Sequence, residues 1–106
     1  MAPHRGDIWR CQFSQPNKRR PVVVLTRDEV LPYMRTVTVA EVTSTIRGIS
    51  SEVIVGPEDG LKHISAVNLD NVQTVSQQRL RGYVGKLSLE KMHEVCRALA
   101  VATGCG

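Results

Sequence analysis

The chain has 106 residues, of which 42% are hydrophobic and 23% are charged. This length suits a single domain, residues 1–106, with a small core built from two packed layers. No apolar run is long enough to span a bilayer, and no signal-peptide core follows the first five residues. These features exclude secreted and membrane-spanning classes, so we expect a cytoplasmic protein.

Three cysteines, an odd number, occur at spacings that match no zinc or haem motif. We therefore expect no disulfide framework, in keeping with a reducing compartment. Cys11 and Cys96 are expected to be small buried side chains, with Cys105 in a loose tail.

The net charge of +4 is unevenly distributed along the chain. Residues 1–50 hold eight Lys and Arg against four Asp and Glu, whereas residues 51–106 hold six of each. A basic surface attracts polyanions such as nucleic acids, but charge alone does not separate RNA from DNA or from an acidic protein.

The first strand is predicted over residues 7–13, where apolar and polar residues alternate. Trp9 and Phe13 would face the core. A turn at residues 14–17 would then return the chain antiparallel, giving a hairpin.

Three cations, Lys18, Arg19 and Arg20, lead directly into Pro21 and a Val-rich run. Because proline has no N–H for a ladder, we expect the second strand to start near Pro21. Arg20 would be the last loop residue before a rigid element, a suitable place for a phosphate clamp. Alternatively, the three cations only solvate a loop and protect an edge strand.

The rest of the first 87 residues predicts short strands separated by turns. A helical turn at residues 27–32 would end at Pro32, and another would lie at residues 76–80. An interruption near Asn71 indicates a bulge or a sharp bend. The expected strands are residues 35–44, 51–55, 65–70, 72–75 and 83–87.

One convincing helix is predicted over residues 88–103, with Ser88 as N-cap and Gly104 as the stop. Its apolar stripe would comprise Leu89, Met92, Val95, Cys96, Leu99 and Thr103. Many short strands with one terminal amphipathic helix predict a mainly β fold, a strongly bent sheet or small SH3-like barrel with the helix packed against it.

Several enzyme classes lack their signatures. The sequence has no Gly-rich phosphate loop, no zincin histidine pair and no Cys-x-x-Cys, and its three histidines are scattered. Arg20 would start one strand and Thr43 would end an antiparallel neighbour, so the two can lie at the same end of the sheet. An arginine and a hydroxyl together suit a phosphodiester. Thr43 is alternatively an ordinary strand residue.

Four segments resemble, in order and spacing, the signature regions of the MazF/PemK family, the toxin ribonucleases of bacterial toxin–antitoxin pairs. The resemblance covers nearly the whole chain. The four segments are Arg5–Trp9, Arg20–Leu25, Val42–Ser44 and Ser65–Val75.

This resemblance implies a dimeric SH3-like barrel that cleaves single-stranded RNA without metal or other cofactor. The ribose 2′-hydroxyl would attack the adjacent phosphate and leave a 2′,3′-cyclic phosphate, and a cognate antitoxin would silence the enzyme. By matching positions, Arg20 and Thr43 would be catalytic. The expected RNA-binding residues are Phe13, Lys18, Arg19, Ser44, Asp70 and Asn71.

Two departures from the family pattern leave the cleavage sequence open. The loop from Ser14 to Arg19 is shorter than is typical, and Asp70-Asn71 stands where many members have Glu-Gln. The alternative function is a toxin of the same fold without nuclease activity, acting on DNA gyrase as CcdB toxins do, or a plain nucleic-acid-binding module.

Overall fold

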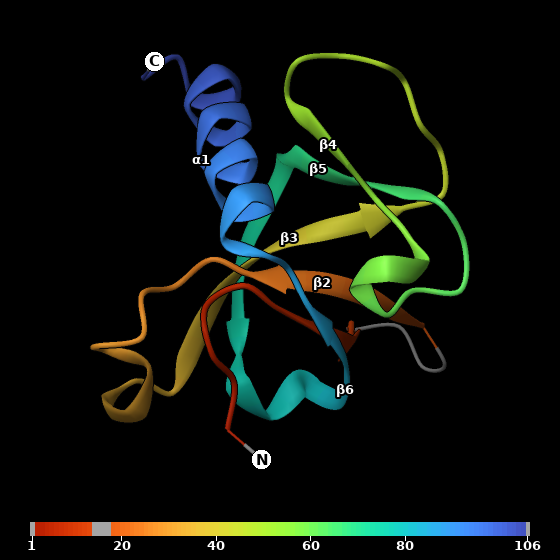
Figure 1. The fold of residues 1–106 in the computed structure, drawn as a ribbon. Coiled ribbons are helices and arrows are strands. Elements are labelled where there is room, and N and C mark those ends of the chain that lie inside the picture. The colour runs from red at the N-terminus through yellow and green to blue at the C-terminus, as the bar shows by residue number, and fades with distance from the viewer. Residues whose placement is uncertain (1, 14–17, 106) are drawn as a thin grey trace.

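A computed structural model of the chain, which describes residues 2–13 and 18–105, shows a mainly β fold with a C-terminal helix (Figure 1). Six antiparallel strands form one sheet in the order β4-β5-β3-β2-β1-β6. The predicted turn at residues 14–17, and with it the shortened loop, lies outside the described residues. The strands are β1 (Asp7–Gln12), β2 (Arg19–Val24), β3 (Thr36–Thr43), β4 (Glu52–Val55), β5 (Ser65–Ser76) and β6 (Leu80–Lys86).

The central strands are buried on both faces of the sheet. Because successive side chains of a strand point to opposite faces, Val23 and Ala40 join a cluster beneath the helix, and Trp9 and Val39 join a second cluster on the other face. Phe13 packs, partly buried, against this second cluster, which confirms that Trp9 and Phe13 point inward.

Cys11 belongs to the second cluster and is fully buried, as expected from the sequence. Burial raises the pKa of its thiol, and the nearby Arg79 guanidinium opposes that rise only in part. Cys11 is therefore a protonated, small apolar side chain of the core.

The sheet is bent into a barrel-like shape but is not closed, because the edge strands β4 and β6 do not pair. A short 3-10 turn, η2 (Pro57–Asp59), follows β4 and lies against β6 instead. A Cβ atom on Gly85 would lie 1.9 Å from the Asp59 carbonyl oxygen, and Gly60 has a φ of +98°. Glycine at both positions allows the two backbones to meet at the open seam.

The interruption predicted near Asn71 is confirmed as a bulge within the continuous strand β5. Ala40 of β3 pairs with Val72, but the next β3 residue, Glu41, pairs with Asn68. The three residues between Asn68 and Val72 therefore have no β3 partner. Such bulges redirect side chains locally.

The terminal helix α1 (Leu89–Thr103) begins and ends as predicted. Ser88 Oγ accepts a hydrogen bond from Lys91 N at 3.1 Å, and Gly104 ends the helix with a φ of 72°. The helix packs on β4 and β5 through Met92, Val95 and Ala98.

The predicted apolar stripe is wrong at three positions, because Leu89, Cys96 and Thr103 are exposed. Leu89 is 74% exposed. The face that touches the sheet is rotated from the predicted stripe: Met92, Val95 and Ala98 are buried, with Leu99 and Ala102 partly buried beside them. In the described part of the chain, every helical segment falls short of the length and apolarity needed to span a membrane.

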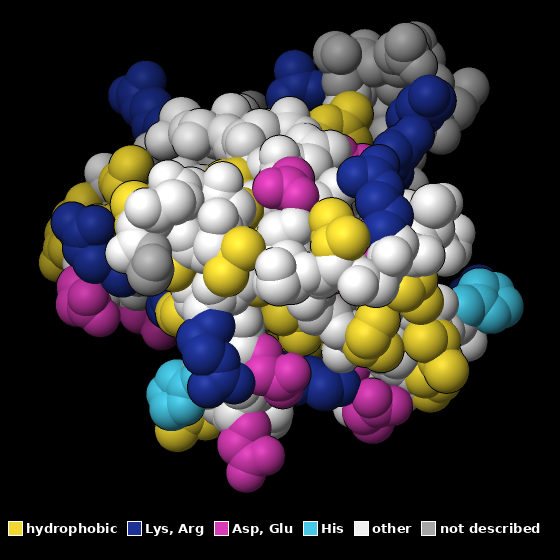
Figure 2. All heavy atoms as spheres, turned by 90° about the horizontal axis from the view of Figure 1, so that it is seen from above, with side chains coloured by type: hydrophobic (Ala, Val, Ile, Leu, Met, Phe, Trp, Pro, Cys, Tyr) yellow, Lys and Arg dark blue, Asp and Glu magenta, His cyan; other side chains and the backbone are white. Residues whose placement is uncertain are grey.

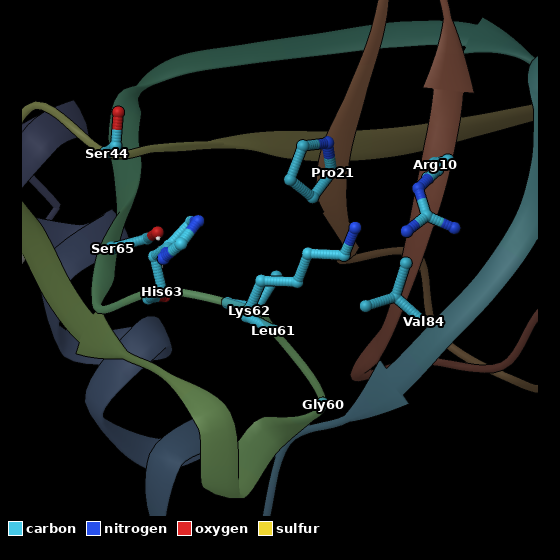
Figure 3. A pocket seen from close by; sticks show the side chains of 9 residues that line it. All are labelled: Arg10, Pro21, Ser44, Gly60, Leu61, Lys62, His63, Ser65 and Val84. Carbon is cyan, nitrogen blue, oxygen red and sulfur yellow. Dashed lines mark hydrogen bonds between the residues drawn. The ribbon is translucent and has the colours of Figure 1, made fainter.

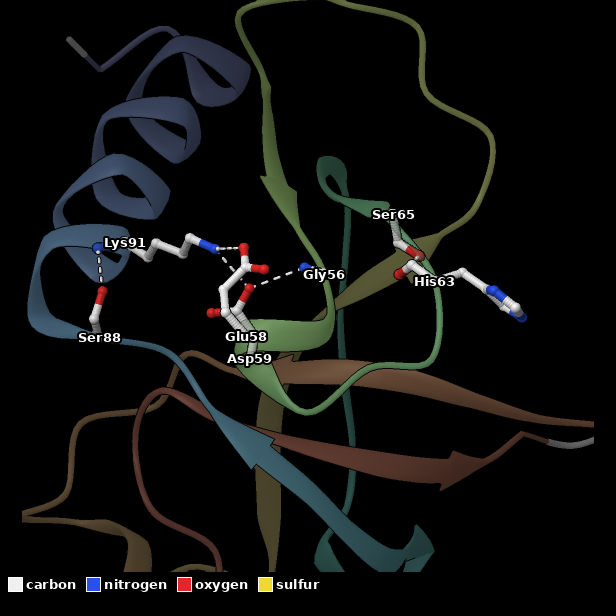
Figure 4. Close-up of polar contacts among 7 residues, drawn as sticks. All are labelled: Gly56, Glu58, Asp59, His63, Ser65, Ser88 and Lys91. Atoms are coloured by element: carbon white, nitrogen blue, oxygen red, sulfur yellow. Dashed lines mark hydrogen bonds and ion pairs between the residues drawn. The ribbon is translucent and has the colours of Figure 1, made fainter.

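A cluster of charges fastens α1 to the turn after β4 (Figure 4). Lys91 Nζ lies 2.6 Å from Asp59 Oδ2 and 2.8 Å from Glu58 Oε1, and Asp59 Oδ2 also accepts from Gly56 N. Burial alone would lower the pKa of Lys91, but the hydrogen bonds that its ammonium donates to Asp59 and Glu58 outweigh burial and raise that pKa. The hydrogen bond from Lys91 lowers the pKa of Glu58. We call Glu58, Asp59 and Lys91 the helix clamp.

Several boundaries differ from the predictions. β2 starts at Arg19, so Arg20 is a strand residue paired with Cys11 rather than the last loop residue. The strand tolerates Pro21 because β3 pairs with β2 only from the next residue onward. The 3-10 turn Leu31–Tyr33 contains Pro32 in its first turn, where proline fits, instead of ending there.

β6 begins at Leu80, three residues earlier than predicted, because it continues the ladder with β1. The helical turn predicted at residues 76–80 is confirmed as the 3-10 segment Gln77–Arg79.

Candidate active site

A pocket of about 220 Å³ opens where β2 begins and β3 ends. The antiparallel pairing of these strands brings Arg20 and Thr43 to the same end of the sheet, as expected from the sequence. We call this the Arg20 pocket. Its lining residues are Arg20, Glu41, Thr43, Thr45, Arg47, Asn68 and Asn71.

The Arg20 guanidinium is held in place by a carboxylate. Arg20 Nη1 lies 2.7 Å from Glu41 Oε1, and the side chain of Arg20 is 50% exposed whereas that of Glu41 is only 11% exposed. The other carboxylate oxygen of Glu41 accepts a hydrogen bond from Asn71 Nδ2. Glu41 therefore orients both an arginine and an amide around the pocket, while half of the arginine side chain stays open to solvent.

The β5 bulge places Asn71 beside Glu41. Asn68 is the residue that pairs with Glu41 in the ladder, and the bulged residues between Asn68 and Val72 include Asn71. Because of this extra length, both asparagines reach the same pocket.

Among the described residues, the Thr43 hydroxyl proton has no acceptor and remains available for a ligand. Its Oγ1 accepts a hydrogen bond from Thr45 N at 3.1 Å, which uses a lone pair of the oxygen and not its proton. The same loop carries Arg47, whose backbone N–H donates to Glu52 Oε1 at 3.0 Å. Within the described ranges, the Arg47 guanidinium has no hydrogen-bond or ion-pair partner, so it is free to meet an anion.

Three of the eight predicted site residues, Arg20, Thr43 and Asn71, line this pocket. The other five lie elsewhere, and their roles stay predictions. Ser44 lines a different pocket. The Asp70 carboxylate accepts a hydrogen bond from Ser51 Oγ at 2.5 Å.

The remaining predicted residues lie around the end of the first hairpin. Arg19 is exposed and its Nε donates to Gln12 Oε1 at 3.1 Å. Lys18 is exposed, and Phe13 is half-buried against the second cluster. Figure 2 shows one face of the molecule, on which Lys and Arg side chains are spread around the rim and hydrophobic side chains are scattered between polar ones.

Sequence reasoning missed Glu41, Thr45 and Arg47 as members of the pocket. The signal for Glu41 was present: a carboxylate within a strand of Val, Ala and Thr, on the same face as Thr43. A buried carboxylate requires a partner, and the sequence did not show that Arg20 is that partner. Among the described residues, no three His, Cys, Asp or Glu side chains gather in a group that could hold a metal ion.

Comparisons with known proteins show which family the chain belongs to. The model of a family described as "PemK-like, MazF-like toxin of type II toxin-antitoxin system" matches residues 4–103. The chain is 45% identical to the probable endoribonuclease MazF5 of Mycobacterium tuberculosis, over 97% of this chain and 94% of that protein. It is 36% identical to the probable endoribonuclease MazF2 of the same species, over 95% and 98% of the two chains.

Solved structures give the same result. The M. tuberculosis toxin MazF-mt6 superposes with a TM-score of 0.87 at 35% identity, covering 94% of this chain and 98% of that one. A mycobacterial endoribonuclease in complex with its cognate antitoxin superposes with a TM-score of 0.88 at 30% identity, covering 99% and 98%. Family model, sequence relatives and fold therefore agree that the chain belongs to the PemK-like, MazF-like toxin family of type II toxin–antitoxin systems.

Proposed function

We propose that this chain is an endoribonuclease toxin that cleaves single-stranded RNA at selected sequences without a metal ion. The observation that carries the proposal is the meeting of Arg20 and Thr43 in one pocket, with Glu41 fixing the arginine. The names of the curated relatives, probable endoribonucleases at up to 45% identity, support the same activity.

The reaction would be an internal transfer at phosphorus. The ribose 2′-oxygen forms a bond to the adjacent phosphorus and gives up its proton. The bond from phosphorus to the 5′-oxygen of the next nucleotide breaks, and that oxygen takes a proton. The products are a 2′,3′-cyclic phosphate and a free 5′-hydroxyl, so no water is consumed in this step.

The protein contribution would be electrostatic stabilisation of the transition state. A guanidinium is protonated in proteins, so Arg20 does not act as base. It stabilises negative charge on the phosphorane, or it gives a proton to the leaving oxygen and regains one from solvent. The Thr43 hydroxyl donates to a non-bridging oxygen. Glu41 is a positioning residue, because both of its oxygens are already engaged by Arg20 and Asn71.

The decisive experiment incubates the purified protein with mixed single-stranded RNA in the presence of a chelator. We expect fragments that end in a cyclic phosphate. Arg20→Ala should lower the cleavage rate by about 10²-fold to 10³-fold, the effect of removing one such donor. The control is Arg97→Ala on α1, which removes an exposed cation from a helix that does not line the pocket and should leave the rate unchanged.

Full cleavage by a folded Arg20→Ala variant, or cleavage that stops when the chelator is added, would contradict the proposal. If the wild-type protein leaves RNA intact but inhibits DNA gyrase, the non-nuclease alternative is correct instead.

The proposal includes two protein partners and a compartment. A structural relative is in complex with its cognate antitoxin, which supports control of this chain by an antitoxin. An extended acidic segment would suit the basic side chains and could cover Arg20. We further propose that the toxin works as a homodimer in the cytoplasm. Light scattering tests whether the toxin is a homodimer. Competition between antitoxin and RNA tests whether the antitoxin covers the Arg20 pocket.

A further inference from the structure

A second pocket, of about 180 Å³, opens at the same end of β2 and β3 but on the opposite face of the sheet. It is lined by Pro21 and Ser44, the chain neighbours of Arg20 and Thr43. Because successive residues of a strand point to opposite faces, the two pockets lie back to back around the same strand ends. We call this second one the Lys62 pocket.

The Lys62 pocket is rich in unpaired positive charge. Two cations line it, Arg10 from β1 and Lys62 from the loop before β5, beside the ring of His63, with no Asp or Glu among its described lining residues. Figure 3 shows the three side chains around one open space. Throughout the described part of the chain, neither the Arg10 guanidinium nor the Lys62 ammonium has a hydrogen-bond or ion-pair partner.

The floor of the Lys62 pocket is apolar. Pro21, Leu61 and Val84 are each partly buried and provide this surface beneath the cations. An apolar floor under a cationic rim matches a nucleotide, whose base has an apolar face and whose phosphate is an anion. Proteins that bind single-stranded RNA use such combinations of stacking surface and basic side chains.

The loop that carries Lys62 and His63 is fastened at both ends. At its start, Gly60 packs tightly against the backbone of β6, and the helix clamp holds the preceding Asp59. At its end, Ser65 Oγ donates to the His63 carbonyl oxygen at 3.2 Å (Figure 4). The pocket is therefore built on a supported backbone, as a specific binding site requires.

From these observations we propose that the Lys62 pocket binds a nucleotide of the RNA that neighbours the scissile phosphate. Arg10 and Lys62 hold its phosphate, its base lies over Leu61 and Val84, and His63 offers a ring for stacking. Ser44, expected from the sequence to bind RNA, would contact the strand here and not in the Arg20 pocket. This inference rests on the proposed function, because it assigns a second subsite for the same RNA.

The test measures binding without cleavage. The probe is a fluorescent, mixed-sequence 2′-O-methyl RNA oligomer, which has no 2′-hydroxyl to attack, and its affinity is measured by anisotropy across a salt series. Each lost phosphate contact should reduce the slope of log K against log salt by about 0.7 for a single strand. We therefore expect Lys62→Ala and Arg10→Ala each to lower that slope, and Lys62→Arg to restore it.

Arg97→Ala on α1 is the matched control, since it removes one exposed cation outside the pocket. An unchanged slope in folded Lys62→Ala and Arg10→Ala variants would overturn the proposal. The same holds if both variants bind RNA normally but lose affinity for an acidic antitoxin peptide, because the occupant would then be the protein partner.

Failure of the proposed function has a different signature. In that case the wild-type protein would leave mixed RNA uncleaved, whether or not it binds the oligomer. A second readout compares cleavage of a dinucleotide with cleavage of a longer RNA. Lys62→Ala should lose several-fold more activity on the longer substrate, which alone reaches both pockets.

Discussion

The two pockets around the ends of β2 and β3 differ in how their cations are held. In the Arg20 pocket, the guanidinium is paired with Glu41, a carboxylate that is only 11% exposed. In the Lys62 pocket, Arg10 and Lys62 have no partner in the described structure. A paired arginine has a fixed position, which catalysis at phosphorus needs. Unpaired cations provide affinity without a fixed geometry, which suffices to bind a flexible strand.

The largest effect that tests this contrast is expected from Glu41. Glu41→Ala leaves Arg20 and Asn71 without their acceptor, so kcat for RNA cleavage should fall by about 10²-fold while KM changes little. Glu41→Gln keeps one acceptor oxygen and should lose less. Stopped-time cleavage assays on folded variants measure both constants. An unchanged kcat in Glu41→Ala would show that pairing with Glu41 does not position Arg20 for chemistry.

The helix clamp gives the next largest effect, on stability. Lys91→Met leaves the buried carboxylate of Asp59, a side chain 5% exposed, without its cation. Breaking a buried pair from one side costs 3–5 kcal/mol. Because Lys91 is partly open to solvent, we expect a loss of about 2 kcal/mol in the free energy of unfolding. Urea denaturation measures it, and Lys86→Met, which loses only a contact of 3.7 Å to Asp7, is the control.

The clamp also predicts the pH dependence of stability. The pKa of Lys91 is raised, so its stabilisation is complete below the ordinary lysine pKa of 10.5 and is lost as pH rises through the raised value. The pKa of Glu58 is lowered, so its stabilisation is present above 4.5 and is lost as pH falls through the lowered value. In Lys91→Met, the free energy of unfolding should fall less steeply with pH, both at high pH, where Lys91 titrates, and at low pH, where Glu58 titrates. The same pH dependence of stability in Lys91→Met and in the wild type would show that the helix clamp does not cause it.

The contrast between the pockets also shows what the sequence could and could not predict. The meeting of Arg20 and Thr43 was predictable, because antiparallel strands of recognisable pattern fix which ends lie together. The partner of Arg20 was not, because it depends on the register that places Glu41 opposite Val22. Register is set by packing over the whole sheet and not by the residues of one strand.

The Lys62 pocket was less accessible to sequence reasoning. Its lining combines β1, β2, β6 and the loop before β5, and the glycine contact across the open seam brings that loop to β6. No local pattern encodes such a contact. For the helix, the sequence predicted both ends correctly from Ser88 and Gly104. It did not predict which face is buried, because that depends on the shape of the sheet beneath the helix.

A smaller effect distinguishes the two arginines. Arg20→Lys keeps the charge but loses the planar fork, so kcat should fall by about tenfold. Arg10→Lys keeps a point charge that still meets a phosphate, so cleavage of a long RNA should fall by only about twofold. Parallel cleavage assays compare them. Equal losses would mean that Arg10 is held as strictly as Arg20 and would remove the contrast between the pockets.

The smallest expected effects concern the neighbours Asp70 and Asn71. The Asn71 amide donates to Glu41 inside the Arg20 pocket, whereas the Asp70 carboxylate accepts from Ser51 outside it. Asn71→Ala should lower kcat about fivefold, as expected for the loss of about 1 kcal/mol from one hydrogen bond. Asp70→Ala should change kcat by less than about twofold. Because the two residues are adjacent in the same bulge, equal effects would show that the bulge as a whole, and not the amide on Glu41, supports the chemistry.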